Sequence, residues 1–117
     1  MNNACALYGE KVIVNLLNQS NMERYLYTYK RASVFSKAYE MMPDFWEDRC
    51  KCIERYVDGE KEDKARYLII ENASLEGCGY IELDYGNSEV PEVDIAILES
   101  YQRNGYEFDA PKVIIKS

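Results

Sequence analysis

The chain has 117 residues, of which 47% are apolar and 30% are charged, as expected for one globular domain that buries a core without disulfides or metals. Its formal charge of −7 disfavours nucleic acid and anionic membrane surfaces as partners. It contains no histidine, which excludes Ser-His and Cys-His catalysis, a histidine general base and histidine-ligated metal sites.

The first half of the chain is predicted to hold one strand and then helices. Residues 11–17, KVIVNLL, are β-rich and predict a strand. After a loop at residues 18–21, Asn21 is expected to cap a helix that begins at Met22. Apolar residues recur at steps of three and four through residues 22–42, which indicates one helix, or two if the chain breaks at residues 31–33. They are Tyr25, Leu26, Tyr29, Ala32, Phe35, Ala38, Tyr39 and Met42.

A further helix is predicted to begin at Pro43, with Asp44 at or near its N-cap, and to end near Gly59. A charged loop follows at residues 59–64. Three strands are then predicted, joined by short turns that favour an antiparallel meander. They cover residues 65–71, 78–85 and 92–98, and residues 106–117 could form a last helix.

The fold class predicted from this order is α+β, with an N-terminal strand, two or three helices, a three-strand meander and a C-terminal helix. Residues 1–117 are expected to form a single domain.

The cysteines and the N-terminus predict a cytoplasmic protein with free thiols. No cysteine pair has C-x-x-C spacing, no apolar run approaches the ~18 residues of a membrane span, and no signal peptide is visible. The four cysteines are expected to act as small buried hydrophobes. They are Cys5, Cys50, Cys52 and Cys78.

The segment that carries a chemical signal is residues 93–105, VDIAILESYQRNG. It is predicted to be a buried strand that leads into a phosphate-binding turn at the start of a helix. Free backbone N–H groups at a helix N-terminus bind anions. Gly105 would let the backbone take a positive φ, and Arg103 would add a cation that can pair with phosphate oxygens.

These residues resemble the cofactor motif of the GNAT superfamily of N-acetyltransferases, Q/R-x-x-G-x-G/A, which follows the fourth strand of that fold. The match covers Gln102, Arg103, Asn104, Gly105, Tyr106 and Glu107, preceded by Ile97 and by Tyr101 beside Gln102. The element order extends the resemblance over residues 11–110.

The resemblance implies a site for acetyl-CoA and transfer of its acetyl group to an amine. The turn, with Gln102, Arg103, Asn104, Gly105 and Tyr106, would hold the pyrophosphate. The backbone of Ile97 and Leu98 would pair with the pantetheine arm. Glu92 and Asp94, two apart on one face of the strand, are the candidates for the general base. The sequence favours the alternative that both carboxylates lie on a solvent-facing edge of the sheet, because polar alternation is common on strands. Helix tyrosines could line an acceptor pocket, but packing and surface roles are favoured for most of them. They are Tyr25, Tyr27, Tyr29 and Tyr39.

The sequence departs from the GNAT pattern at three points. Glu107 stands where the family has a small residue, and its carboxylate would repel a pyrophosphate. Pro111 falls inside the expected last helix, which could break near Ala110. The chain is also expected to lack the C-terminal half of the fold, which would leave the edge of residues 92–98 open to a second copy or a partner chain.

Three hypotheses therefore remain. The chain could be an acetyl-CoA-dependent N-acetyltransferase that is incomplete alone, with a small-molecule or peptide amine as acceptor. It could be a non-catalytic GNAT-like module that oligomerises or binds a partner through its exposed sheet edge. It could also be an unrelated α+β binding domain, which would be favoured if the three strands formed no meander.

Overall fold

A computed structural model of the chain describes residues 6–116. They form one antiparallel sheet in the order β1-β2-β3-β4-β5, in which every neighbouring pair is also consecutive in the chain. The predicted α+β class and three-strand meander are confirmed. The strands are β1 (Ala6–Tyr8), β2 (Val12–Leu16), β3 (Lys64–Glu71), β4 (Gly77–Asp84) and β5 (Glu92–Ile97).

The helices follow the predicted order. Of the two alternatives for residues 22–42, the structure has two helices, separated at Ser33, whose backbone is extended (φ −60°, ψ 145°). Pro43 occupies the first turn of its helix, with Asp44 next to it. The elements are α1 (Met22–Ala32), α2 (Ser36–Met41), α3 (Pro43–Val57), the 3₁₀ turn η1 (Glu99–Tyr101) and α4 (Tyr106–Lys116).

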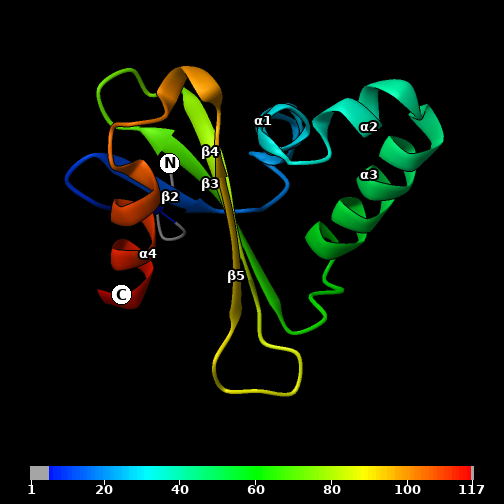
Figure 1. The fold of residues 1–117 in the computed structure, drawn as a ribbon. Helices are drawn as coiled ribbons and strands as arrows, with labels where there is room; N and C mark the ends of the chain where they lie inside the picture. Colours follow the sequence, from blue (N-terminus) through cyan, green and yellow to red (C-terminus); the bar gives the residue numbers. More distant parts are fainter. Residues whose placement is uncertain (1–5, 117) are drawn as a thin grey trace.

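The helices cover both faces of the sheet (Figure 1), so that residues 6–116 contain two apolar clusters. On one face, α1, α2 and α3 pack tyrosines against Leu68, Ile70 and Tyr80. On the other face, α4 packs Tyr106, Ala110 and Val113 against the sheet. None of the helices within residues 6–116 is long and apolar enough to cross a membrane.

Four sequence predictions need correction. The strand β1 was missed, because three residues are too short to show alternation and are defined by pairing with β2. Asn21 precedes α1, but its side chain makes no cap bond. Instead it accepts from the Asn18 N–H (2.9 Å) and donates to the Leu16 carbonyl (3.0 Å).

The other two corrections concern the C-terminal region. Helix α4 does not break at Ala110 but continues through Pro111 to Lys116, because Tyr106, Ala110 and Val113 bury one face of it along both sides of the proline. The strand β5 is not buried throughout: Ile97 is buried, whereas Glu92, Val93 and Asp94 are exposed. It is the last strand of the sheet in residues 6–116, so no strand there pairs with its outer edge.

The cysteines match the prediction in part. Cys50, Cys52 and Cys78 are free thiols. Cys78 is buried, and burial raises the pKa of its thiol to about 12. Cys50 and Cys52 are only half-buried, because the outer side of α3 faces solvent. Cys5 lies outside the described residues.

Candidate functional site

The outer edge of β5 carries backbone groups that a ligand could pair with. The Leu98 N–H donates to the Cys78 carbonyl (2.8 Å), which fixes the hydrogen-bonding phase between β4 and β5. In an antiparallel pair, every second residue exchanges backbone hydrogen bonds with the neighbouring strand. The N–H and C=O groups of Glu92, Asp94 and Ala96 therefore bond to β4. The N–H and C=O groups of Val93, Ile95 and Ile97 therefore point away from β4.

The C-terminal end of this edge is closed by Gln102. Its side-chain amide donates to the Ile97 carbonyl (3.0 Å). Both backbone groups of Leu98 are also engaged, since its carbonyl accepts from the Tyr101 N–H (2.8 Å). Of the pair predicted to bind pantetheine, Ile97 thus has an N–H that faces outward, while Leu98 is occupied within the chain.

Five consecutive backbone N–H groups, those of residues 103–107, have no acceptor among residues 6–116. They lie between η1 and the first turn of α4, whose earliest bonded amides are those of Phe108 and Asp109, both donating to the Gly105 carbonyl. Such a row of free amides at a helix N-terminus concentrates positive potential. It lies at the turn that the sequence predicted as an anion site.

The turn takes its shape from two left-handed residues and one asparagine. Arg103 has φ +68° and Gly105 has φ +81°, a region that costs a non-glycine residue roughly 1 kcal/mol or more. The Asn104 side chain donates to the Tyr101 carbonyl (3.0 Å) and more weakly to the Gln102 carbonyl (3.4 Å). These bonds hold the turn closed while its amides stay unpaired.

Arg103 and Glu107 line one hollow beside the edge of β5. It is ≈ 470 Å³ in volume and is also bordered by Gln102 and by apolar side chains of β5 and the end of α1. Arg103 is exposed and Glu107 half-buried. The cation that suits an anion and the carboxylate that opposes one therefore border the same hollow.

Tyr106 has a structural side chain at the start of α4. Its hydroxyl donates to a Glu71 carboxylate oxygen at 2.6 Å. This bond lowers the pKa of Glu71, and together with burial it raises the pKa of Tyr106 to about 12. Of the groups of Tyr106, the backbone N–H is the one left unpaired at the predicted anion site within residues 6–116.

Glu92 and Asp94 are exposed on β5, on the sheet face that α1 and α3 cover. Asp94 accepts a hydrogen bond from the Tyr80 hydroxyl (3.2 Å). Burial first, and Asp94 second, raise the pKa of Tyr80. Asp94 is thus linked to the buried aromatic cluster, whereas the Glu92 side chain makes no hydrogen bond or ion pair within residues 6–116. Their catalytic role stays a prediction.

The helix tyrosines divide between packing and surface. Tyr25, Tyr29 and Tyr39 are buried in the aromatic cluster, whereas Tyr27 is 60% exposed. Sequence reasoning did not single out Tyr80 or Lys11. Tyr80 approaches Asp94, and the Lys11 ammonium donates to the Asn104 carbonyl at 3.1 Å. No local motif marks either residue, because both contacts join separate elements.

Comparison with solved structures identifies the fold, whereas no sequence family and no curated protein match the chain. A structure described as "Putative GnaT-family acetyltransferase from Bordetella pertussis" matches with a TM-score of 0.67 at 13% identity, covering 95% of this chain and 70% of that one. An acetyltransferase of the GNAT family from Bacillus anthracis matches with a TM-score of 0.61 at 15% identity, covering 95% and 64%.

A third match carries a ligand in its description. The structure of AAC(6')-Iy in complex with a bisubstrate analogue, CoA-S-monomethyl-acetylneamine, has a TM-score of 0.60 at 16% identity, over 90% of this chain and 67% of that one. Residues 6–116 therefore have the GNAT acetyltransferase fold. The chain spans about two thirds of the length of the structures it matches.

Proposed function

We propose, with the GNAT acetyltransferase fold as premise, that this chain supplies the acetyl-CoA-binding wall of an N-acetyltransferase that acts on an amine. The observation that carries the proposal is the row of five unpaired N–H groups at residues 103–107, next to the unpaired edge of β5. The two features lie next to each other, so an extended ligand with an anionic end could pair with the edge of β5 and place its anion at the free amides.

The residues present fit such a ligand in two parts. The free amides of the turn and the Arg103 guanidinium would hold the pyrophosphate. The outward N–H and C=O groups of Ile95, with the Ile97 N–H, would pair with the amides of the pantetheine arm as an added strand does. When bound, acetyl-CoA supplies an acetyl group activated as a thioester.

Asp94 is the better candidate of the two carboxylates for the general base. An acceptor ammonium must lose a proton before its nitrogen can attack a carbonyl carbon. Ala96 borders the hollow beside the turn. Asp94 lies on the same face of the strand two residues earlier, about 7 Å away, and is therefore close to this hollow. The Tyr80 hydroxyl orients the Asp94 carboxylate. Glu92 lies a further two residues from the turn.

A second candidate function is a non-catalytic module that pairs with a second copy or a partner chain. It is favoured by the free edge of β5, where Val93 is 53% exposed, and by the Glu107 carboxylate in the hollow. An exposed edge of this kind is a template for another strand. A partner strand there would occupy the position proposed for pantetheine, so the two functions exclude one another at this edge.

The test measures binding of acetyl-CoA to the full chain by calorimetry and thermal shift, with S-acetyl-pantetheine as a comparison that lacks the pyrophosphate. A ligand at 100 times its dissociation constant stabilises the folded state by about 2.7 kcal/mol. Two variants accompany it. Gly105→Ala alters the anion turn, and Gly86→Ala imposes a left-handed alanine (φ +51°) in a loop with nothing near the added methyl group.

We expect acetyl-CoA to bind, S-acetyl-pantetheine to bind far more weakly, and Gly105→Ala to weaken binding while Gly86→Ala does not. Equal binding of the two ligands, or no thermal shift at millimolar acetyl-CoA, would overturn the proposal. Release of CoA thiol in the presence of an amine panel, lost in Asp94→Asn but kept in Glu92→Gln, separates the enzyme from the non-catalytic module.

A further inference from the structure

We infer that the turn between β1 and β2, residues 9–11, is a positioning element for the anion-binding turn, and that Lys11 and Asp109 are the two residues through which it acts. The inference rests on the proposed function and extends it to residues outside the GNAT motif. The contacts join positions 93 and 98 residues apart in the chain.

Lys11 fixes the orientation of one peptide unit in the turn. Its ammonium donates to the Asn104 carbonyl at 3.1 Å. In a planar trans peptide the C=O and the following N–H point in opposite directions. Holding the Asn104 carbonyl toward Lys11 therefore turns the Gly105 N–H away from the β1–β2 turn, to the side where it has no acceptor. Lys11 thus acts on the anion site through the backbone.

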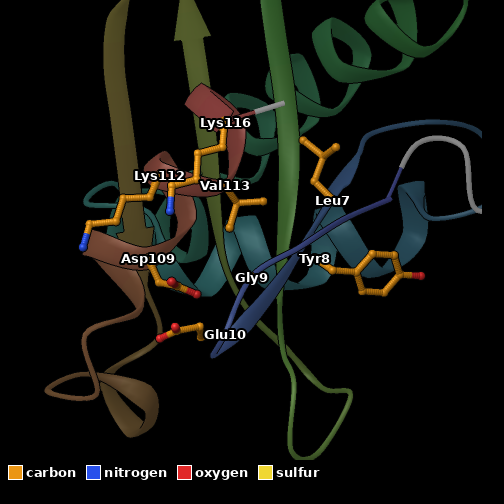
Figure 2. A pocket seen from close by; sticks show the side chains of 8 residues that line it. All are labelled: Leu7, Tyr8, Gly9, Glu10, Asp109, Lys112, Val113 and Lys116. Carbon is orange, nitrogen blue, oxygen red and sulfur yellow. The ribbon is translucent and has the colours of Figure 1, made fainter.

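Asp109 fixes the beginning of α4 against the same turn. One carboxylate oxygen accepts from the Lys11 N–H (3.1 Å) and from the Val12 N–H (3.2 Å). Figure 2 shows the Asp109 side chain facing the chain at Gly9 and Glu10. Since Asp109 lies in the first turn after the free amides, its two bonds hold the helix N-terminus in place relative to the sheet.

The approach of the two segments is close enough to require glycine at residue 9. A Cβ on Gly9 would lie 2.5 Å from a Val113 methyl group and 2.7 Å from the Asp109 carboxylate. Gly105, which follows Asn104, also leaves little room for a side chain, because an added Cβ would lie 3.1 Å from the Lys11 ammonium. The contacts with Lys11 and Asp109 thus form one packed unit.

Lys11 also brings a cation to an acidic neighbourhood. Glu10 precedes it, and the Asp109 carboxylate accepts a hydrogen bond from its backbone N–H. Its ammonium approaches the turn from the side of a second hollow, which Asn72, Asn104 and Tyr106 also border. The positive charge near the backbone of residues 104 and 105 favours an anion at the adjacent amides.

The experiment compares Lys11→Met with Lys37→Met in the full chain. Both remove one lysine charge, but Lys37 is an exposed residue of α2, on the face of the sheet opposite to α4. Lys11→Arg restores a cationic donor, and Asp109→Asn weakens the second link. Backbone ¹⁵N order parameters of residues 103–107 are measured without ligand, and the same amides are followed during titration with inorganic pyrophosphate.

We expect Lys11→Met to lower the Gly105 order parameter from about 0.85 toward 0.6 and to weaken pyrophosphate binding about tenfold. Asp109→Asn should lower both the order parameter and the affinity. Lys11→Arg should recover most of both, and Lys37→Met should change neither. Unchanged order and affinity in Lys11→Met, or an equal loss in Lys37→Met, would overturn the inference. If wild type does not bind pyrophosphate, but Lys11→Met still lowers the Gly105 order parameter, the proposed function is overturned and the positioning contact is supported.

Discussion

Replacing Glu107 by glutamine is expected to strengthen acetyl-CoA binding, although it removes a charge that suits the helix to which it belongs. The carboxylate lies in the first turn of α4 and borders the same hollow as Arg103. It therefore opposes a phosphate at the free amides of residues 103–107. The substitution keeps the size of the side chain and removes the repulsion.

The magnitude follows from Coulomb's law. Two like charges about 7 Å apart repel by about 0.6 kcal/mol in water and about 2.4 kcal/mol at an effective dielectric constant of 20. Because Glu107 is half-buried, a value near 1 kcal/mol is expected, which is about a fivefold gain in affinity. A negative charge in the first turn of a helix stabilises it by about 0.3–1 kcal/mol, so the same variant should be slightly less stable.

Glu107→Gln is expected to raise the affinity for acetyl-CoA and to lower the free energy of unfolding, so the two effects can be told apart. Calorimetry with acetyl-CoA gives the affinity, and chemical denaturation without ligand gives the free energy of unfolding. Glu54→Gln is the matched control, since it removes the same charge from an exposed position on α3. The gain should shrink in 0.5 M salt. An affinity equal to wild type in Glu107→Gln, or an equal gain in Glu54→Gln, would refute the placement of the ligand.

Three further substitutions test the fold around the site. Tyr106→Phe removes the 2.6 Å hydrogen bond to Glu71, which lowers the pKa of Glu71 in the folded state. The stabilisation from this bond is present above the unfolded pKa of about 4.3 and is lost as the pH falls through the lowered folded pKa. The melting temperatures of the wild type and the variant should therefore converge in acid and differ most near pH 7. Gly79→Ala would push a methyl carbon against the Ala96 carbonyl oxygen, and denaturant unfolding should show a loss of about 1–3 kcal/mol. An unchanged midpoint would contradict the close pairing of β4 and β5. Pro111→Ala should stabilise the protein by about 2 kcal/mol, from about 3 kcal/mol of helix preference less about 1 kcal/mol of unfolded-chain entropy, and a loss of stability would show that the proline is not in a regular helix.

Local features of the sequence were sufficient for most elements. The strands of the meander, the break near Ser33 and the helix start at Pro43 depend on patterns within a few residues, and the structure has them at these places. The same holds for the turn before α4, where Gly105 takes the positive φ that its identity suggests. Short-range sterics and turn chemistry encode such features directly.

Features that depend on distant partners could not be predicted. Asn21 had the right position for a cap, but its side chain bonds to the end of β2 instead. Pro111 left open a helix break near Ala110, yet the apolar face of α4 on the sheet outweighs the local cost of the proline. The strand β1 exists only through its pairing with β2.

The candidate site divides in the same way. A glycine turn with an arginine at a helix start could be predicted from local residues, because the conformation of that turn depends on its own residues. Which backbone groups stay free could not be predicted, since this depends on the Gln102 side chain bonding to the Ile97 carbonyl and on the Lys11 ammonium bonding to the Asn104 carbonyl. A hydrogen bond between residues 93 positions apart leaves no local pattern, because its energy is gained only when the sheet brings the two segments together.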